Sequence, residues 1–267
     1  MKPIALTVMA CILGTGASSY AGNISEVKGT EVKTAEVKSG PSTAALVELY
    51  TSEGCSSCPP ADKQLSKLKE QLGPDAAIVP LSLHVTYWDA IGWKDVFAQK
   101  AFDTRQGDLL EGKPNRVVYT PQFFVSGNEL RTWRNDLPDT IRRINARPAP
   151  VAITLKTASA ENGKVSLDVL TQSVGAKQVD GDLYVALSEN ALSSKVLRGE
   201  NSGVTLHHDN TVRLWYGPIK LKQGTAQFRQ EVSLPGGWNR RNLQAVAFVQ
   251  EPNDGNVLQA VSTARGL

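Results

Sequence analysis

Two cysteines, Cys55 and Cys58, stand three positions apart in the stretch TSEGCSSCPPAD, directly after an apolar run. Such a pair is typical of three arrangements: a structural disulfide, half of a metal site, or a redox pair that exchanges with other thiols. At the start of a helix, the helix dipole and the free backbone N–H groups favour the thiolate, which is the species that attacks disulfides. In this chemistry Cys55 is the exposed nucleophile and Cys58 is the buried cysteine that resolves the mixed disulfide.

Four further residues are candidates for shaping the chemistry of this pair. Glu53 places a negative charge near Cys55, which works against formation of the thiolate. His84 ends an apolar run, and we expect it to hydrogen-bond to its neighbours, with proton transfer and metal ligation as open alternatives. Trp88 could line a peptide groove, and we expect Asp89 to cap a turn or the following helix.

Three functions therefore compete. The leading expectation is thiol–disulfide exchange, which needs no cofactor. A metal-binding chaperone is the second, because Cys55, Cys58 and His84 would be suitable ligands for Cu(I) or Zn(II). The third is a binding module with a structural disulfide, which is weakened by the short loop that the disulfide would close.

The elements that must position these residues alternate between strands and helices. An apolar run at 44–50 predicts a buried strand, and apolar residues at three- and four-residue intervals over 61–72 predict an amphipathic helix. Further strands are expected at 76–85 and on both sides of the Gly-Asn pair at 127–128, and further helices within 93–111 and 136–145.

The pattern of apolar and polar residues changes after a Pro-rich junction near residue 148. Short alternating runs separated by Gly, Asn and Asp then continue to the end of the chain, which is typical of a β-sandwich. Within this part, residues 198–203 suggest a tight loop. The neighbouring His207 and His208 are expected on opposite faces of a strand, with a His–Asp pair involving Asp209 as a weaker alternative.

The first residues predict export. Residues 1–21 have one positive charge, an apolar segment of about half the ~20 residues that a membrane span needs, and small residues before a cleavage point after Ala21. We therefore expect a periplasmic or secreted protein without a membrane span after cleavage. Residues 22–42, with Glu-Val-Lys repeated three times, are expected to form a flexible tail. The net charge of +3 is spread along the chain, so nucleic acid is not an expected partner.

Residues 44–146 resemble the thioredoxin fold. More specifically, VELYTSEGCSSCPPAD, LSLHVTYWDAIGWKDVFA, RVVYTPQFFVSG and VLRGENSG resemble a bacterial family of secreted proteins known as domain of unknown function 1223. The resemblance implies an α/β domain at 43–148, with a mixed sheet flanked by helices, followed by an all-β sandwich-like domain at 149–267. It also implies that Thr120-Pro121 is a cis bond beside the cysteines, where the backbone of Thr120 would hold an extended substrate peptide.

The same resemblance suggests the partners. They would be thiols or disulfides of secreted proteins, together with a membrane or periplasmic protein that restores the redox state of the pair. Ser56 and Ser57 stand between the cysteines. This dipeptide tunes the reduction potential of such pairs, but it does not indicate the direction of exchange.

Overall fold

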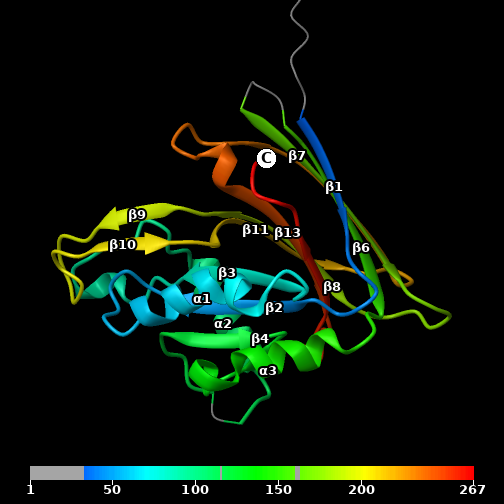
Figure 1. Ribbon diagram of the computed structural model, residues 1–267, viewed down its shortest axis with the longest axis horizontal. Helices are drawn as coiled ribbons and strands as arrows, with labels where there is room; N and C mark the ends of the chain where they lie inside the picture. The colour runs from blue at the N-terminus through cyan, green and yellow to red at the C-terminus, as the bar shows by residue number, and fades with distance from the viewer. Residues whose placement is uncertain (1–32, 115, 160–162) are drawn as a thin grey trace, which may run out of the picture. The chain divides into compact units, whose positions relative to one another are not determined.

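The computed structural model describes residues 33–114, 116–159 and 163–267 (Figure 1). The expected signal peptide at 1–21 and the first part of the expected tail, 22–32, lie outside these ranges. Within the described ranges, no helix has the length and apolar character that crossing a membrane requires.

The described residues form three α-helices and fourteen strands. The helices are α1 (Pro59–Leu72), α2 (Lys100–Leu110) and α3 (Trp133–Asn145), with two 3-10 turns, η1 (Asp89–Ile91) and η2 (Arg240–Asn242). The strands before residue 148 are β1 (Lys33–Lys38), β2 (Ala45–Thr51), β3 (Ile78–His84), β4 (Gln122–Val125) and β5 (Asn128–Glu129). The later strands are β6 (Val151–Ser159), β7 (Lys164–Ser173), β8 (Asp182–Glu189), β9 (Leu192–Lys195), β10 (Thr205–His208), β11 (Thr211–Lys220), β12 (Thr225–Ser233), β13 (Leu243–Gln250) and β14 (Val257–Ser262).

The largest sheet joins strands from both parts of the sequence. Its eight strands run in the order β14-β13-β8-β11-β3-β2-β4-β5, and β3 pairs in parallel with both β2 and β11. The protein is therefore mostly β, and the expected α/β thioredoxin-like domain followed by a separate all-β domain is wrong. The reason is that β3 offers an open edge that β11 covers, and strand patterns in a sequence do not show which edges will pair.

A second sheet contains four strands in the order β1-β6-β7-β12. In β1, residues 33–38 of the expected flexible tail pair antiparallel with β6. Val37 packs against the apolar core there, while Glu36 forms an ion pair with Lys156 of β6. Val37 is the one partly buried residue of β1 and the other five are exposed, so residues 33–38 form an edge strand that is held mainly by its backbone pairing with β6, and the expected flexible tail is wrong for this segment.

The candidate site is built at the end of β2. Every residue of this strand is buried, because α1 and α3 cover one face and α2 covers the other. Figure 1 shows these helices gathered around β2, β3 and β4, while the four-stranded sheet packs against β8 and β13 through a separate core. The loop that follows β2 leads into α1 and carries both cysteines.

Candidate functional site

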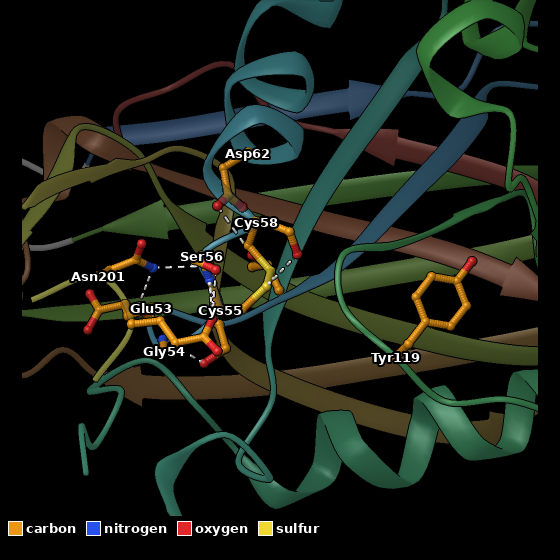
Figure 2. Close-up of a disulfide and its surroundings, with 12 residues drawn as sticks. Glu53, Gly54, Cys55, Ser56, Cys58, Asp62, Tyr119 and Asn201 are labelled. Atoms are coloured by element: carbon orange, nitrogen blue, oxygen red, sulfur yellow. Dashed lines mark hydrogen bonds between the residues drawn. A yellow bond between two sulfur atoms is a disulfide. The ribbon is translucent and has the colours of Figure 1, made fainter. Parts of the chain in front are cut away.

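Cys55 and Cys58 form a disulfide at the start of α1 (Figure 2). Cys58 is the N-cap residue of the helix, and its carbonyl oxygen accepts hydrogen bonds from the backbone N–H groups of Ala61 and Asp62. Pro59 and Pro60 fill the first turn, where a missing N–H costs nothing. Both cysteines are fully buried, so the expectation that Cys55 is exposed is wrong. The exposed residues of this loop are Ser56 and Ser57, which lie between the cysteines.

A hairpin covers the disulfide. Strands β9 and β10 pair, and the residues between them, 196–204, form what we call the hairpin tip. Asn201 on this tip is buried and donates from Nδ2 to the carbonyl oxygens of Glu53 and Cys55, at 2.8 and 3.0 Å. The carboxylate of Glu200 accepts from the backbone N–H and hydroxyl of Ser56, at 3.0 and 2.7 Å. Four hydrogen bonds therefore hold the tip over the cysteine loop (Figure 2).

Two glycines lie against tryptophans at this site. Gly199 on the hairpin tip has a φ of +76°, and a Cβ atom there would lie 3.4 Å from Cβ of Trp93. Gly54, next to Cys55, would place an added Cβ 3.3 Å from Cβ of Trp88. Both tryptophans are partly exposed and pack against the loops that surround the disulfide.

Two buried carboxylate–imidazole pairs lie behind the cysteine loop. His84 Nδ1 is 2.7 Å from Asp95 Oδ2, and His208 Nε2 is 3.2 Å from Glu53 Oε1. The two imidazole rings pack edge to face, with centroids 4.9 Å apart. The second ring nitrogen of each histidine, Nε2 of His84 and Nδ1 of His208, is buried and has no hydrogen-bond partner among the described residues.

Asp95 connects these pairs to the cysteine loop. Its Oδ2 also accepts from the backbone N–H of Glu53 at 2.8 Å, while Glu53 Oε2 accepts from Trp93 Nε1 at 2.7 Å. Burial alone would lower the pKa of His84, but the charge and hydrogen bond of Asp95 outweigh burial and leave that pKa raised. Burial likewise acts to raise the pKa of Asp95, and His84 with two backbone N–H groups outweighs it and leaves that pKa lowered. Both pKa shifts favour the charged forms of His84 and Asp95 as a pair.

Asp62 is a third carboxylate beside the cysteines. Its Oδ2 accepts from the hydroxyl of Thr51 at 3.2 Å, whereas its Oδ1 is buried and has no partner in the part of the chain that the structure describes. Burial raises the pKa of Asp62, and the charges of His84 and His208 act in the opposite direction without cancelling the effect. A carboxyl group in this setting gives up and takes back a proton more readily near neutral pH than an exposed aspartate does.

The remaining expected site residues lie around this centre. Thr120-Pro121 is a cis bond, as the resemblance implied, and it leads into β4, where Gln122 pairs with Tyr50 of β2. Thr120 is therefore near the end of β2, although Figure 2 shows the preceding Tyr119 well apart from the disulfide. Asp89 accepts the backbone N–H of Asp95 with its Oδ1 at 3.1 Å, so it orders the loop that carries Asp95.

The chelate expected from Cys55, Cys58 and His84 is not formed in the described part of the chain. The two sulfurs are bonded to each other, and His84 Nδ1 is bound to Asp95. Among the described residues, no group of three or more His, Cys, Asp or Glu side chains is arranged to hold a metal ion. Binding of Cu(I) or Zn(II) after reduction stays a prediction.

Several residues of the site were missed in the sequence. No sequence pattern indicates Asp95 as a site residue. Asp62 could have been found from one spacing, because it stands four positions after Cys58 at the start of the predicted helix, which places the two residues on one face. His207 and His208 do point to opposite faces, with only His208 buried, but His208 pairs with Glu53 and not with Asp209. This pairing joins residues 155 positions apart, which no local pattern reveals.

Comparison with known proteins gives the family and the fold. Among solved structures, protein AGR_C_4864 from Agrobacterium tumefaciens has a TM-score of 0.58 at 23% identity, covering 84% of this chain and 95% of that one. HBP35 of Porphyromonas gingivalis has a TM-score of 0.64 at 16% identity, covering 85% of this chain and 78% of that one. At these identities the likeness shows the fold alone.

No curated protein matches the sequence. A family model described as "Protein of unknown function (DUF1223)" matches residues 46–250, which include the cysteine loop, the hairpin tip and both carboxylate–imidazole pairs. The match covers more than half of the sequence and confirms the resemblance inferred from the motifs: the chain belongs to the DUF1223 family.

Proposed function

We propose that the protein exchanges disulfides with the thiols of other secreted proteins, using Cys55 and Cys58. The observation that carries the proposal is the disulfide at the first turn of α1, directly after the buried strand β2. A thiolate released there faces the positive end of the helix dipole. This dipole stabilises the leaving sulfur during exchange.

The geometry favours Cys55 as the sulfur that a partner attacks. Cys55 adjoins the exposed Ser56, and its Sγ is 3.4 Å from the hydroxyl of the exposed Ser57. Cys58 is the N-cap of α1, under the first helical turn. A partner thiolate that attacks Cys55 breaks the S–S bond and releases Cys58 as a thiolate. A second partner thiol then displaces Cys55, so the partner becomes oxidised and the pair reduced; the reverse sequence reduces a partner disulfide.

The hairpin tip must move before a partner reaches the disulfide, because Cys55 is fully buried beneath it. The hydrogen bonds of Glu200 to Ser56 are at the exposed rim, so water can replace them when the tip opens. Ile91 and Leu197 are exposed apolar side chains beside or on this tip. They would contact an apolar segment of a protein partner more readily than a small thiol.

The proposed location is the periplasm or the extracellular space. It rests on the signal peptide expected at 1–21 and on the disulfide, since disulfides are typical of oxidising compartments. In that setting a membrane or periplasmic redox protein would restore the state of the pair after each turnover.

The test is a trapping experiment with the mature chain, residues 22–267. The Cys58→Ala variant keeps Cys55 but cannot resolve a mixed disulfide, so it should accumulate covalent adducts with secreted proteins that thiol reductants release. The Cys55→Ala variant is the matched control, and it should accumulate few adducts.

The reduction potential of the wild-type pair supplies the second measurement. Equilibration against glutathione should give a reversible midpoint within the range of known oxidoreductases, about −120 to −270 mV. A pair that stays oxidised below about −300 mV, together with no adducts from Cys58→Ala, would identify a structural disulfide and overturn the proposal.

A further inference from the structure

The side chain of Asp62 lies close to Cys58 at the start of α1. The two residues are four positions apart, at the N-cap and in the first turn of α1, and the backbone N–H of Asp62 donates to the carbonyl oxygen of Cys58 at 3.1 Å. Residues at this spacing share one helix face, and helical side chains lean back toward the N-terminus. The carboxylate of Asp62 therefore leans toward the turn that holds Cys58, and Figure 2 shows the two side by side.

Among the described residues, one oxygen of this carboxylate accepts a hydrogen bond and the other accepts none. Thr51 donates to Oδ2, while Oδ1 is buried and has no partner. An unpaired buried oxygen destabilises a folded protein and calls for an explanation. A role in which Oδ1 receives a proton supplies one.

Asp62 also reaches a groove. A cavity of about 360 Å³ lies between α1 and β10, and Asp62 is partly exposed on its wall although its Oδ1 is buried. The cavity is also lined by Pro59, Lys63, Val204, Leu206 and His208. Asp62 thus connects the interior around Cys58 with a groove large enough for several water molecules.

The charged groups around Asp62 come from four elements. His84 on β3, His208 on β10 and Asp95 in the loop after η1 act on its charge from the interior. Lys63 and Lys67 of α1, with His207 and Asp209 at the end of β10, line the groove. Burial outweighs the interior histidines and raises the pKa of Asp62, which brings its titration closer to the pH at which a thiol must be deprotonated.

We propose that Asp62 accepts the proton of the Cys58 thiol when the reduced pair closes, and that the groove between α1 and β10 carries this proton to solvent. The inference rests on the proposed exchange function. In the mixed disulfide between Cys55 and a partner, the S–H proton of Cys58 passes to Oδ1 of Asp62. The Cys58 thiolate attacks Cys55 Sγ, the bond from Cys55 to the partner breaks, and the partner leaves with the electron pair as a thiolate. The cysteine pair is oxidised and the partner sulfur is reduced.

The first test measures ring closure directly. The reduced mature chain reacts with one equivalent of dithiobis-nitrobenzoate, which leaves thionitrobenzoate on Cys55, and Cys58 then displaces it as a coloured anion. The Asp62→Asn variant should release this second equivalent roughly 100-fold more slowly near neutral pH, since positioned acid–base groups contribute at least about that factor. Its rate should rise with pH until Cys58 ionises without the help of a base, and the difference from wild type should then disappear. Asp75→Asn, a change at an exposed aspartate, is the matched control and should behave as wild type.

The second test does not require exchange. In the reduced Cys55→Ser chain, ultraviolet absorbance of the thiolate follows the ionisation of Cys58 alone. Asp62→Asn removes a negative charge next to this thiol, so Cys58 should ionise at a lower pH than in the Asp62 parent.

The two tests separate the possible failures. Equal release rates in the wild type and Asp62→Asn, or an unchanged Cys58 titration, would overturn the role of Asp62 while leaving exchange intact. Absence of the second thionitrobenzoate equivalent from the wild type would instead count against the exchange function. In that case the titration of Cys58 would still show whether Asp62 affects the ionisation of this thiol.

Discussion

The buried pair of His84 and Asp95 makes the stability of the protein depend on pH. His84 has a pKa raised above its unfolded value of 6.5 by Asp95, so its contribution is fully present below about pH 6.5. This contribution is lost as the pH rises through the folded pKa. Asp95 has a lowered pKa, so its contribution is present above its ordinary value of 3.8 and is lost as the pH falls through the folded pKa.

The His84→Gln variant tests this pair. At about pH 6 it should lose roughly 3–5 kcal/mol of unfolding free energy, because Asp95 is left as a buried charge without its partner. The difference from wild type should shrink as the pH rises and His84 of the wild type becomes neutral. Denaturant titrations at several pH values measure it, with the exposed His207→Gln as control. A difference that does not change with pH would show that His84 is neutral in the folded protein.

At the residue scale, the sequence predicts those site residues whose type and short spacing are typical of a known chemistry. Cys55 and Cys58 were identified from their spacing, and the cis bond at Thr120-Pro121 from the family resemblance. Asp95 could not be identified, because it acts through contacts with Glu53 and His84 that are 42 and 11 positions away. A carboxylate in a loop has no periodic pattern that would reveal such partners.

At the scale of elements, the hairpin tip controls access to the disulfide. Two residues of the tip form hydrogen bonds with the cysteine loop. The amide of Asn201 donates to two carbonyl oxygens, and the carboxylate of Glu200 accepts from Ser56 at the exposed edge of the loop. Loss of the Asn201 amide removes one hydrogen bond from each of the carbonyl oxygens of Glu53 and Cys55, although the latter still accepts from the backbone N–H of Cys58. The closed tip is then less favourable. Opening is then more frequent, because each lost hydrogen bond of this kind contributes about 1 kcal/mol.

The Asn201→Ala variant should therefore be reduced by dithiothreitol faster than wild type. Two hydrogen bonds at about 1 kcal/mol each correspond to an increase in rate of roughly 30-fold when opening limits the reaction. The appearance of free thiols after rapid mixing measures the rate. Asn253→Ala, a change at an exposed turn residue, controls for the loss of an amide. Equal rates for all three proteins would show that the tip does not limit access.

Local sequence patterns predicted individual helices and strands better than they predicted which of these elements lie next to one another. The strand β2 and the helix α1 were expected from an apolar run and from three- and four-residue spacing, and both are present. The segment expected to be helical over 93–111 is helical only from Lys100 to Leu110, because residues 93–99 form the loop that holds Asp95. Residues 198–203 were expected to form a tight loop, but their place over the disulfide depends on pairing between distant segments.

At the scale of the whole described chain, contacts tie the two sides of residue 148 together. Arg105 on α2 binds the carboxylate of Glu48 on β2 and the amide of Gln250 on β13, and it stacks against aromatic rings that include Phe248. Gln259 of β14 accepts from the backbone N–H of Ala44 at 2.8 Å. Sequence patterns gave the strands of both halves but not this shared sheet, because pairing across about a hundred residues is set by tertiary packing.

The shared sheet predicts that residues 43–148 do not fold alone. Without the later strands, β3 loses its partner β11 along one edge, and the buried ion pair of Glu48 and Arg105 loses Gln250 and its aromatic cover. An open strand edge and a poorly covered ion pair both favour unfolding or aggregation. The fragment should therefore show no cooperative thermal transition by calorimetry and little near-ultraviolet circular dichroism, whereas residues 22–267 should unfold in one transition. A cooperative transition in the fragment would show that the first half of the sheet, with its three helices, is an independent folding unit to which the later strands are added.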